Sequence, residues 1–395
     1  MKKNLDSLDG RAIEGMRTLV RVDFNVPLDN GSVADDTRIV AALPTINWLR
    51  TRGARVILLS HLGRPKSAPD PAFSLRPVAD RLEQILGAPV TFLPDPLDDT
   101  TVQATKRMKR GEVALVENTR FWPGETANDP AFTEQLARLG DLFVNDAFGA
   151  IHRAHASTEG LAHLLKPAVA GFLLAKELEF LGRVMDNPKP PVVAVLGGAK
   201  ISGKIDVIEA LLPKVDEILI GGAMACTFFL AQGHEVGNSL VEPDRVEMAR
   251  DLLQRAGTKL VLPSGATVAK NPDSSDTKVV SPGGIPAGFA MYDIDPGTAS
   301  DYATRIEAAK TVLWNGPMGV FEKPPFDAGT VAVAEAIAHA TENGATTLVG
   351  GGDSAAAIVV AGLEDDVTHV STGGGASLEF LEGKQLPGIT ALDDA

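Results

Sequence analysis

Short runs of apolar, often β-branched residues recur along the chain, and each is followed by a segment with helical periodicity. Such continuous runs are typical of parallel strands that are buried on both faces of a sheet. Their alternation with helical segments predicts βαβ units and an α/β fold. We find no repeat of fixed period, which argues against a solenoid. The expected strands form two series, 18–24, 55–60, 112–116 and 142–145, followed by 191–196, 217–220, 259–262, 311–314 and 346–349.

A helix-like stretch, Ala175–Met185, separates the two series and ends at the proline-rich segment Asp186–Pro191. Prolines at this spacing stop a helix, so we place a domain boundary here. A chain of 395 residues suits two or three domains at roughly 150 residues each. A helix is stiffer than a Gly/Ser linker, so this one is suited to carry motion between domains.

Charge and cysteine content narrow the class of protein. The net charge is −14, which disfavours nucleic acid as a partner, although a few arginines in one cleft still attract a small anion. The single cysteine, Cys226, cannot form an internal disulfide and fits a reducing compartment. Segment 1–11 lacks the apolar core of a signal peptide, and no apolar run reaches the ~18 residues of a membrane span. We therefore expect a cytoplasmic protein that contacts no membrane.

Basic side chains follow the expected strands of the first series. Ligands of open parallel sheets bind beyond the carboxyl ends of the strands. Guanidinium groups match the geometry of phosphate and carboxylate and keep their charge at any working pH. One such residue alone is more often a solvated surface group, but four loops that each carry Arg or His predict a site for a small molecule with both phosphate and carboxylate. The set comprises Arg38, His61, Arg64, Arg120, His152, Arg153 and His155.

Glycine-rich turns follow the strands of the second series, which favours a nucleotide. Segment Gly198–Lys204 nearly fits a P-loop, but Ile205 stands where that motif needs a hydroxyl, so we reject a standard P-loop. Backbone N–H groups at a helix start still favour anions, and Lys200 and Lys204 lie four residues apart on one helical face. The alternative is a glycine turn with two surface lysines.

A second glycine turn, Gly350–Ser354, also enters a helix. Asp353 suits Mg²⁺, which binds one or two carboxylates together with substrate phosphates, and the alternative is a helix N-cap. Ser354 is not read as a hydrolase nucleophile, because Ala356 breaks the required glycine pattern. The turn Ser371–Ser377 resembles a further anion-binding helix start, and Glu322 is suited to accept hydrogen bonds from ribose or to remain a surface glutamate.

These segments together resemble the phosphoglycerate kinase family over nearly the whole chain. The number, order and spacing of the matching runs make the resemblance highly specific. The runs are Arg21–Pro27, Asp36–Ile39, Ser60–Pro65, Glu117–Asn118 with Arg120–Phe121, His152–Ser157, Gly197–Lys200, Trp314–Glu322, Gly350–Ser354 and His369–Pro387.

The resemblance implies two doubly wound, Rossmann-like domains joined by a hinge helix. The expected bounds are 1–172 for a 3-phosphoglycerate domain, 173–186 for the hinge, 187–370 for a nucleotide domain and 371–395 for a segment that returns to the first domain. It also implies reversible, Mg²⁺-dependent phosphoryl transfer from 1,3-bisphosphoglycerate to ADP, a step of glycolysis, by a monomer. We expect the domains to close around the substrates, with Glu177 or Glu179 pairing with His369.

Site residues follow from the same resemblance, position by position. Arg38 and Lys200 are expected to contact the transferring phosphoryl group, and Asp353 to hold Mg²⁺. The residues expected to bind the 3-phosphoglycerate moiety are Asp23, Asn25, Arg38, His61, Arg64, Arg120 and Arg153. Those expected to bind the nucleotide are Lys204, Asn315, Glu322, Gly351, Gly352, Asp353 and Ser354.

Three positions depart from the family pattern, and two other functions stay open. Ala223 replaces a usual glycine near the adenine, Ser354 replaces a frequent threonine, and Ile151 stands where smaller residues are common. These departures bear on nucleotide preference and kinetics. The alternatives are another Mg-nucleotide phosphotransferase that acts on a small carboxylate, such as an acetate-type kinase, and a catalytically inactive nucleotide-binding module.

Overall fold

The computed structural model describes residues 2–9, 12–66 and 68–395. Its backbone contacts divide the chain into two compact units. The N-unit is Met1–Glu179 with Gln385–Ala395, and the C-unit is Phe180–Lys384. The expected helix at 175–185 lies within α7 (Phe172–Asp186), in which this division falls. The division places residues 371–384 in the C-unit, and the finer domain bounds expected from the sequence stay a prediction.

A six-stranded, wholly parallel sheet forms the centre of the N-unit, in the order β5-β6-β4-β1-β7-β8. All four runs expected in this half are strands, whereas β5 and β8 were not expected. The strands are β1 (Arg17–Val22), β4 (Arg55–Leu59), β5 (Val90–Leu93), β6 (Val113–Val116), β7 (Leu142–Asp146) and β8 (Ala168–Ala170), with a small hairpin of β2 (Leu28–Asp29) and β3 (Ser32–Val33).

The C-unit has a second parallel sheet, in the order β11-β10-β9-β15-β16-β17, and all five runs expected there are strands. It also has an antiparallel sheet, β13-β12-β14, which is not among the predicted elements. The strands are β9 (Val192–Leu196), β10 (Glu217–Ile220), β11 (Leu260–Val261), β12 (Ala266–Ala269), β13 (Lys278–Val280), β14 (Ala290–Ile294), β15 (Thr311–Asn315), β16 (Thr346–Gly350) and β17 (His369–Val370).

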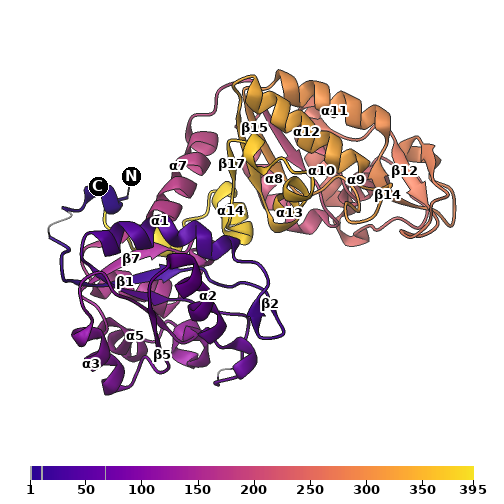
Figure 1. Cartoon of the computed structure of the whole chain (residues 1–395). Coiled ribbons are helices and arrows are strands. Elements are labelled where there is room, and N and C mark those ends of the chain that lie inside the picture. Colours follow the sequence, from indigo (N-terminus) through magenta and orange to yellow (C-terminus); the bar gives the residue numbers. More distant parts are fainter. Residues whose placement is uncertain (1, 10–11, 67) are drawn as a thin grey trace. The chain divides into compact units, whose positions relative to one another are not determined.

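Helices cover both faces of each parallel sheet (Figure 1), which confirms the expected α/β architecture. Every residue of β9 and of β15 is buried, as strands covered on both faces require. Aspartates begin several helices: Asp129 caps α5 by accepting the N–H of Phe132 at 2.8 Å. The N-unit helices are α1 (Thr37–Thr51), α2 (Arg76–Leu86), α3 (Asp99–Arg107), α4 (Pro123–Thr126), α5 (Pro130–Ala137), α6 (Leu161–Leu164) and α15 (Pro387–Thr390). The C-unit helices are α8 (Ile205–Leu211), α9 (Met224–Ala231), α10 (Val246–Ala256), α11 (Pro296–Ala308), α12 (Ala328–Glu342), α13 (Gly352–Val360) and α14 (Gly374–Leu381).

The strand order of each sheet reverses direction once. In the N-unit the chain runs outward from β1 to β4 and then returns to β7 on the other side of β1. In the C-unit the same reversal separates β9 from β15. Crevices at such switch points, beyond the carboxyl ends of the strands, are where open α/β sheets bind ligands. Across the described ranges, no helix is both long and apolar enough to span a bilayer.

Candidate active site

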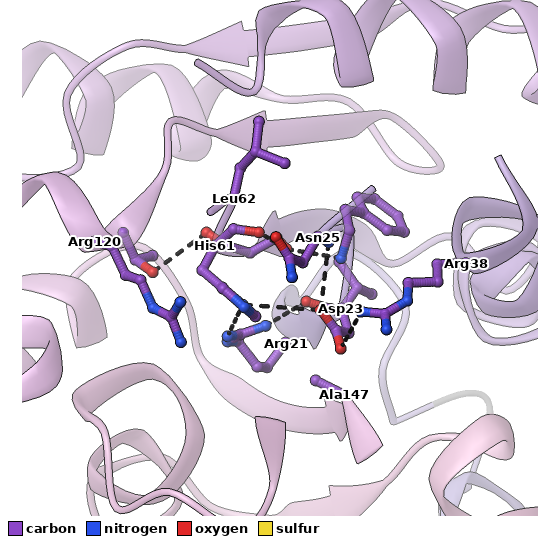
Figure 2. Close-up of polar contacts among 12 residues, drawn as sticks. Arg21, Asp23, Asn25, Arg38, His61, Leu62, Arg120 and Ala147 are labelled. Carbon is purple, nitrogen blue, oxygen red and sulfur yellow. Dashed lines mark hydrogen bonds and ion pairs between the residues drawn. The ribbon is translucent and has the colours of Figure 1, made fainter. Parts of the chain in front are cut away.

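Basic and polar side chains gather at the carboxyl ends of β1 and β4 in the N-unit (Figure 2). Arg38, in the first turn of α1, donates from Nη1 to Oδ2 of Asp23 at 2.9 Å. The other oxygen of Asp23 accepts the backbone N–H of Asn25 at 3.3 Å. Oδ1 of Asn25 in turn accepts the N–H of Gly63 at 2.8 Å. These bonds hold the loops after β1 and β4 together in the free protein.

A fully buried arginine, Arg21, lies beneath this surface. Its Nη2 is 3.0 Å from Nδ1 of His61, and its Nε donates to Oγ of Ser157 at 2.8 Å. Burial lowers the pKa of Arg21, while Glu125 and Asp23 act in the opposite direction. Arg21, Ser157 and Glu125 are not among the site residues predicted from the sequence, although Arg21 and Ser157 lie within the matching runs.

Arg120 and Arg153 complete the cluster. Arg120 follows β6 in the turn Thr119–Phe121 and donates from Nη1 to the carbonyl oxygen of Gly63 at 2.7 Å. Its buried Nε has no hydrogen-bond partner within the described residues. Burial, and then the charges of Arg21 and Arg153, lower the pKa of Arg120 to about 10. Nε of Arg153 is 3.1 Å from Nε2 of His152.

Two histidines near these arginines, His61 and His155, have lowered pKa values. Burial, followed by the charge of Arg21 and the other arginines of the cluster, lowers the pKa of His61 well below 6.5. The pKa of His155 falls to about 4, again through burial first. Arg64, in contrast, is exposed on the loop after β4. The N-unit therefore presents fixed positive charge and neutral donors around Asp23, an arrangement suited to a compact anion.

Glycines line a cavity of about 610 Å³ at the switch point of the C-unit. Gly198, Gly222 and Tyr292 are among its lining residues, together with Glu322 and Asp353. A Cβ on Gly222 would lie 2.5 Å from the backbone nitrogen of Gly198, and Gly222 has a φ of +67°. Only glycine fits this close approach, which leaves a flat, backbone-lined wall. Ala223 also lines the cavity, so its replacement of the usual family glycine occurs in the wall itself.

Lys204 lies at the start of α8 and is largely buried. Its Nζ donates to Oδ1 of Asn315, the last residue of β15. Burial lowers the pKa of Lys204 to about 8, and the charges of Asp353 and Glu382 oppose that shift. The side-chain nitrogen Nδ2 of Asn315 is buried with no hydrogen-bond partner within the described ranges. Lys204 and Asn315 thus offer a cation and a spare donor at the end of one strand.

In the turn Gly350–Ser354, two residues stabilise the start of α13 and a third, Asp353, lines the cavity. Gly351 has a φ of +91° and is the N-cap of α13, so the alternative of Asp353 as the cap is wrong. Ser354 is buried, and its Oγ accepts the N–H of Gly316 at 2.5 Å, which ties α13 to the loop after β15. Asp353 is exposed in the first turn of α13 and faces the cavity.

The residues present fit Mg²⁺. The described residues contain no group of three or more His, Cys, Asp or Glu that would form a complete metal cage. Mg²⁺ does not need one, because it binds through one or two carboxylates, water and substrate phosphates. Asp353 offers such a carboxylate at the cavity wall. Lys200 is exposed after β9, and Glu322 is exposed at the cavity rim.

Two parallel α/β units, one with an arginine-rich anion site and one with a glycine-lined cavity, define a phosphotransferase that handles a nucleotide and a small anionic substrate. The phosphoglycerate kinase family model matches residues 8–384. Phosphoglycerate kinase of Chloroherpeton thalassium is 55% identical over 100% of both chains, and that of Chloroflexus aurantiacus is 57% identical over 96% of this chain and 97% of its own. The solved phosphoglycerate kinase of Coxiella burnetii is 41% identical with a TM-score of 0.90, covering 99% of this chain and 98% of its own. The chain belongs to the phosphoglycerate kinase family.

Proposed function

We propose that this chain transfers a phosphoryl group between 1,3-bisphosphoglycerate and ADP, giving 3-phosphoglycerate and ATP. One observation carries the proposal: basic side chains from the start of α1 and from the loops after β4, β6 and β7 gather around His61 in the N-unit, while the C-unit presents a glycine-lined cavity with Asp353 at its wall. Family membership supports the same reaction.

In this proposal the N-unit cluster binds the 3-phosphoglycerate moiety. Arg38, Arg120 and Arg153 neutralise its phosphate and carboxylate, and His61 and Asn25 donate neutral hydrogen bonds. Asp23 holds Arg38 in place and leaves hydrogen-bonding capacity for a substrate hydroxyl. Arg64, exposed on the loop after β4, reaches the substrate from the solvent side.

The C-unit binds the nucleotide. Lys204 and Asn315 contact its phosphates, the Gly351–Gly352 backbone approaches them closely, and Glu322 accepts hydrogen bonds from the ribose. Ser354 keeps the turn attached to the strand end. Asp353 would hold Mg²⁺, which supplies charge neutralisation on the nucleotide phosphates.

Catalysis in this scheme is positioning and electrostatics. A phosphoryl group in flight spreads negative charge over three oxygens, so Arg38 and Lys200 stabilise it without any protein nucleophile. Water must be excluded, or the acyl phosphate would be hydrolysed; closure of the two domains stays a prediction on that ground. We further propose that the protein acts as a cytoplasmic monomer.

The decisive experiment supplies the purified protein with Mg²⁺, ADP and one phosphoryl donor at a time. We expect ATP to form with 1,3-bisphosphoglycerate and not with acetyl phosphate. ATP formation from acetyl phosphate would instead support the acetate-type kinase. Nucleotide binding without turnover on either donor would identify an inactive module.

A further inference from the structure

A buried chain of polar groups runs beneath the anion site of the N-unit. Glu125 is fully buried and accepts two hydrogen bonds from one residue. Oγ of Ser157 donates to Oε1 at 2.6 Å, and the backbone N–H of Ser157 donates to Oε2 at 3.1 Å. Because both carboxylate oxygens accept, an amide in place of Glu125 would present its NH₂ to one of these donors. The site is therefore built for a carboxylate.

The orientation of the Ser157 hydroxyl determines its hydrogen bond with Arg21. Its proton is committed to Glu125, so the oxygen is left to accept, and Nε of Arg21 donates to it at 2.8 Å. Nη1 of Arg21 donates to the carbonyl oxygen of Val22. These two bonds hold the guanidinium so that Nη2 lies 3.0 Å from Nδ1 of His61. A guanidinium has no acceptor, so Nδ1 must be the acceptor.

We propose that Glu125 and Ser157 are positioning residues that hold Arg21 against His61, so that His61 stays neutral with its proton on Nε2. His61 then offers a neutral N–H donor on the ring edge away from Arg21. Its use toward substrate rests on the proposed function. The state of the ring does not, because it is set by groups of the free protein (Figure 2).

The charges around His61 show why a device of this kind is needed. Oδ1 of Asp23 lies 3.8 Å from the same Nδ1, and a carboxylate there favours a proton on that nitrogen. Arg21 opposes the effect of Asp23 from a shorter distance. The charges of Arg120, Arg153 and Arg38 act in the same direction as that of Arg21. Burial acts with the arginines to lower the pKa of His61. Without the bond from Arg21, the choice between the two tautomers would depend on Asp23.

The test is ¹⁵N NMR of the imidazole nitrogens in the whole, ligand-free protein near pH 7.5. Long-range ¹H–¹⁵N correlations distinguish a protonated ring nitrogen from a bare one. The signals of His61, one of seven histidines, are assigned by their loss in His61→Asn. We expect a bare Nδ1 and a protonated Nε2. A proton on Nδ1, or an imidazolium, would overturn the proposal.

Ser157→Ala removes the acceptor of Arg21 Nε, and we expect it to populate the second His61 tautomer. Thr105→Val is the matched control: it deletes an equally buried hydroxyl on α3, which donates to the carbonyl of Val102 at 2.9 Å, and should leave His61 unchanged. Ser157→Thr, which keeps the hydroxyl, should restore the wild-type tautomer. If Ser157→Ala folds and His61 does not change, the positioning role is wrong. If Ser157→Ala does not fold, the same NMR measurement on Glu125→Gln, which disturbs the same chain of hydrogen bonds, and the wild-type spectrum test the positioning role.

Titration with 3-phosphoglycerate separates this proposal from the proposed function. We expect Ser157→Ala to weaken binding about three- to tenfold, the loss of one oriented hydrogen bond, with the affinity for ADP unchanged. If the wild type shows the expected tautomer but does not bind 3-phosphoglycerate, the proposed function fails and the positioning role stands. If wild-type binding is normal and His61 carries its proton on Nδ1, the positioning role fails alone.

Discussion

Replacing Arg38 with alanine should stop turnover and leave the fold intact. The side chain of Arg38 is 39% exposed and donates a hydrogen bond to Asp23, which is 10% exposed, at 2.9 Å. Because Asp23 is largely buried, the loss of this hydrogen bond between charged groups costs roughly 1.5 to 3 kcal/mol of stability. A cationic group on a transferring phosphoryl is worth roughly 10³- to 10⁵-fold in rate, or about 4 to 7 kcal/mol of transition-state stabilisation. The two effects differ enough to be separated.

The assay measures kcat for ATP formation alongside urea unfolding of the same preparations. Arg81→Ala is the matched control, because Arg81 is 42% exposed in the same unit and pairs with Asp36 at 2.6 Å. We expect Arg38→Ala to unfold within about 3 kcal/mol of the wild type and Arg81→Ala within about 1 kcal/mol. Only Arg38→Ala should lose at least about 10³-fold in kcat. A near-normal kcat for Arg38→Ala, or an equal loss in Arg81→Ala, would refute the assignment of Arg38 to the phosphoryl group.

Four further predictions follow from the same structure. Asp353→Asn should raise the Mg²⁺ concentration needed for half-maximal activity, because a carboxylate ligand loses its charge; an unchanged Mg²⁺ titration would remove Asp353 from the metal site. Affinity for ADP, measured by calorimetry, should fall as the pH rises through about 8, where free Lys204 loses its proton, and Lys204→Arg should flatten that dependence. Burial raises the pKa of Asp293 to about 7, above its unfolded value, so its protonation stabilises the fold at low pH and that stabilisation is lost between about pH 4 and 7. Chemical denaturation should show that the wild type loses up to roughly 1.4 kcal/mol of unfolding free energy per pH unit as the pH rises through this range, whereas Asp293→Asn should not. Identical pH slopes in the two proteins would contradict this prediction. Small-angle scattering should give a smaller radius of gyration with both substrates bound than with one or none, and a constant radius would refute domain closure.

Strand prediction succeeded where the apolar runs are long and failed where packing alone defines the strand. The run at 311–314 is wholly buried, and the run at 191–196 is buried from Val192 onward, as their continuous apolar sequence predicts. β5 has four residues between prolines, with Thr91 exposed, so it has neither a long apolar run nor a clear alternation. The antiparallel sheet was missed for a related reason. Two of the three residues of β13 are exposed, and its partners β12 and β14 lie on either side of a glycine- and proline-rich stretch.

The sequence led to the residues that follow strands and missed those that support them, and the roles of the selected residues stay a prediction. Arg38 and His61 were selected because post-strand loops carry ligand groups in this fold class. Arg21 lies inside β1, where a single polar residue gives no sign of which partners it meets. Its partners Ser157 and Glu125 are far away in sequence and reach it because β7 pairs with β1. Such contacts depend on topology, which the local pattern does not encode.

The arginine cluster of the N-unit and the lysine at the C-unit cavity differ in how they hold their charge, and this difference sets how each ligand couples to pH. Arg120 has a pKa of about 10 and His61 one well below 6.5, so neither changes charge between pH 6.5 and 8. Binding of an anion in the N-unit therefore causes no proton uptake by these two groups in that range. Lys204, with a pKa of about 8, is partly neutral in the free C-unit, and a bound phosphate favours its charged form. Nucleotide binding at Lys204 should then take up a fraction of a proton near pH 8, whereas Arg120 and His61 take up none when the small acid binds.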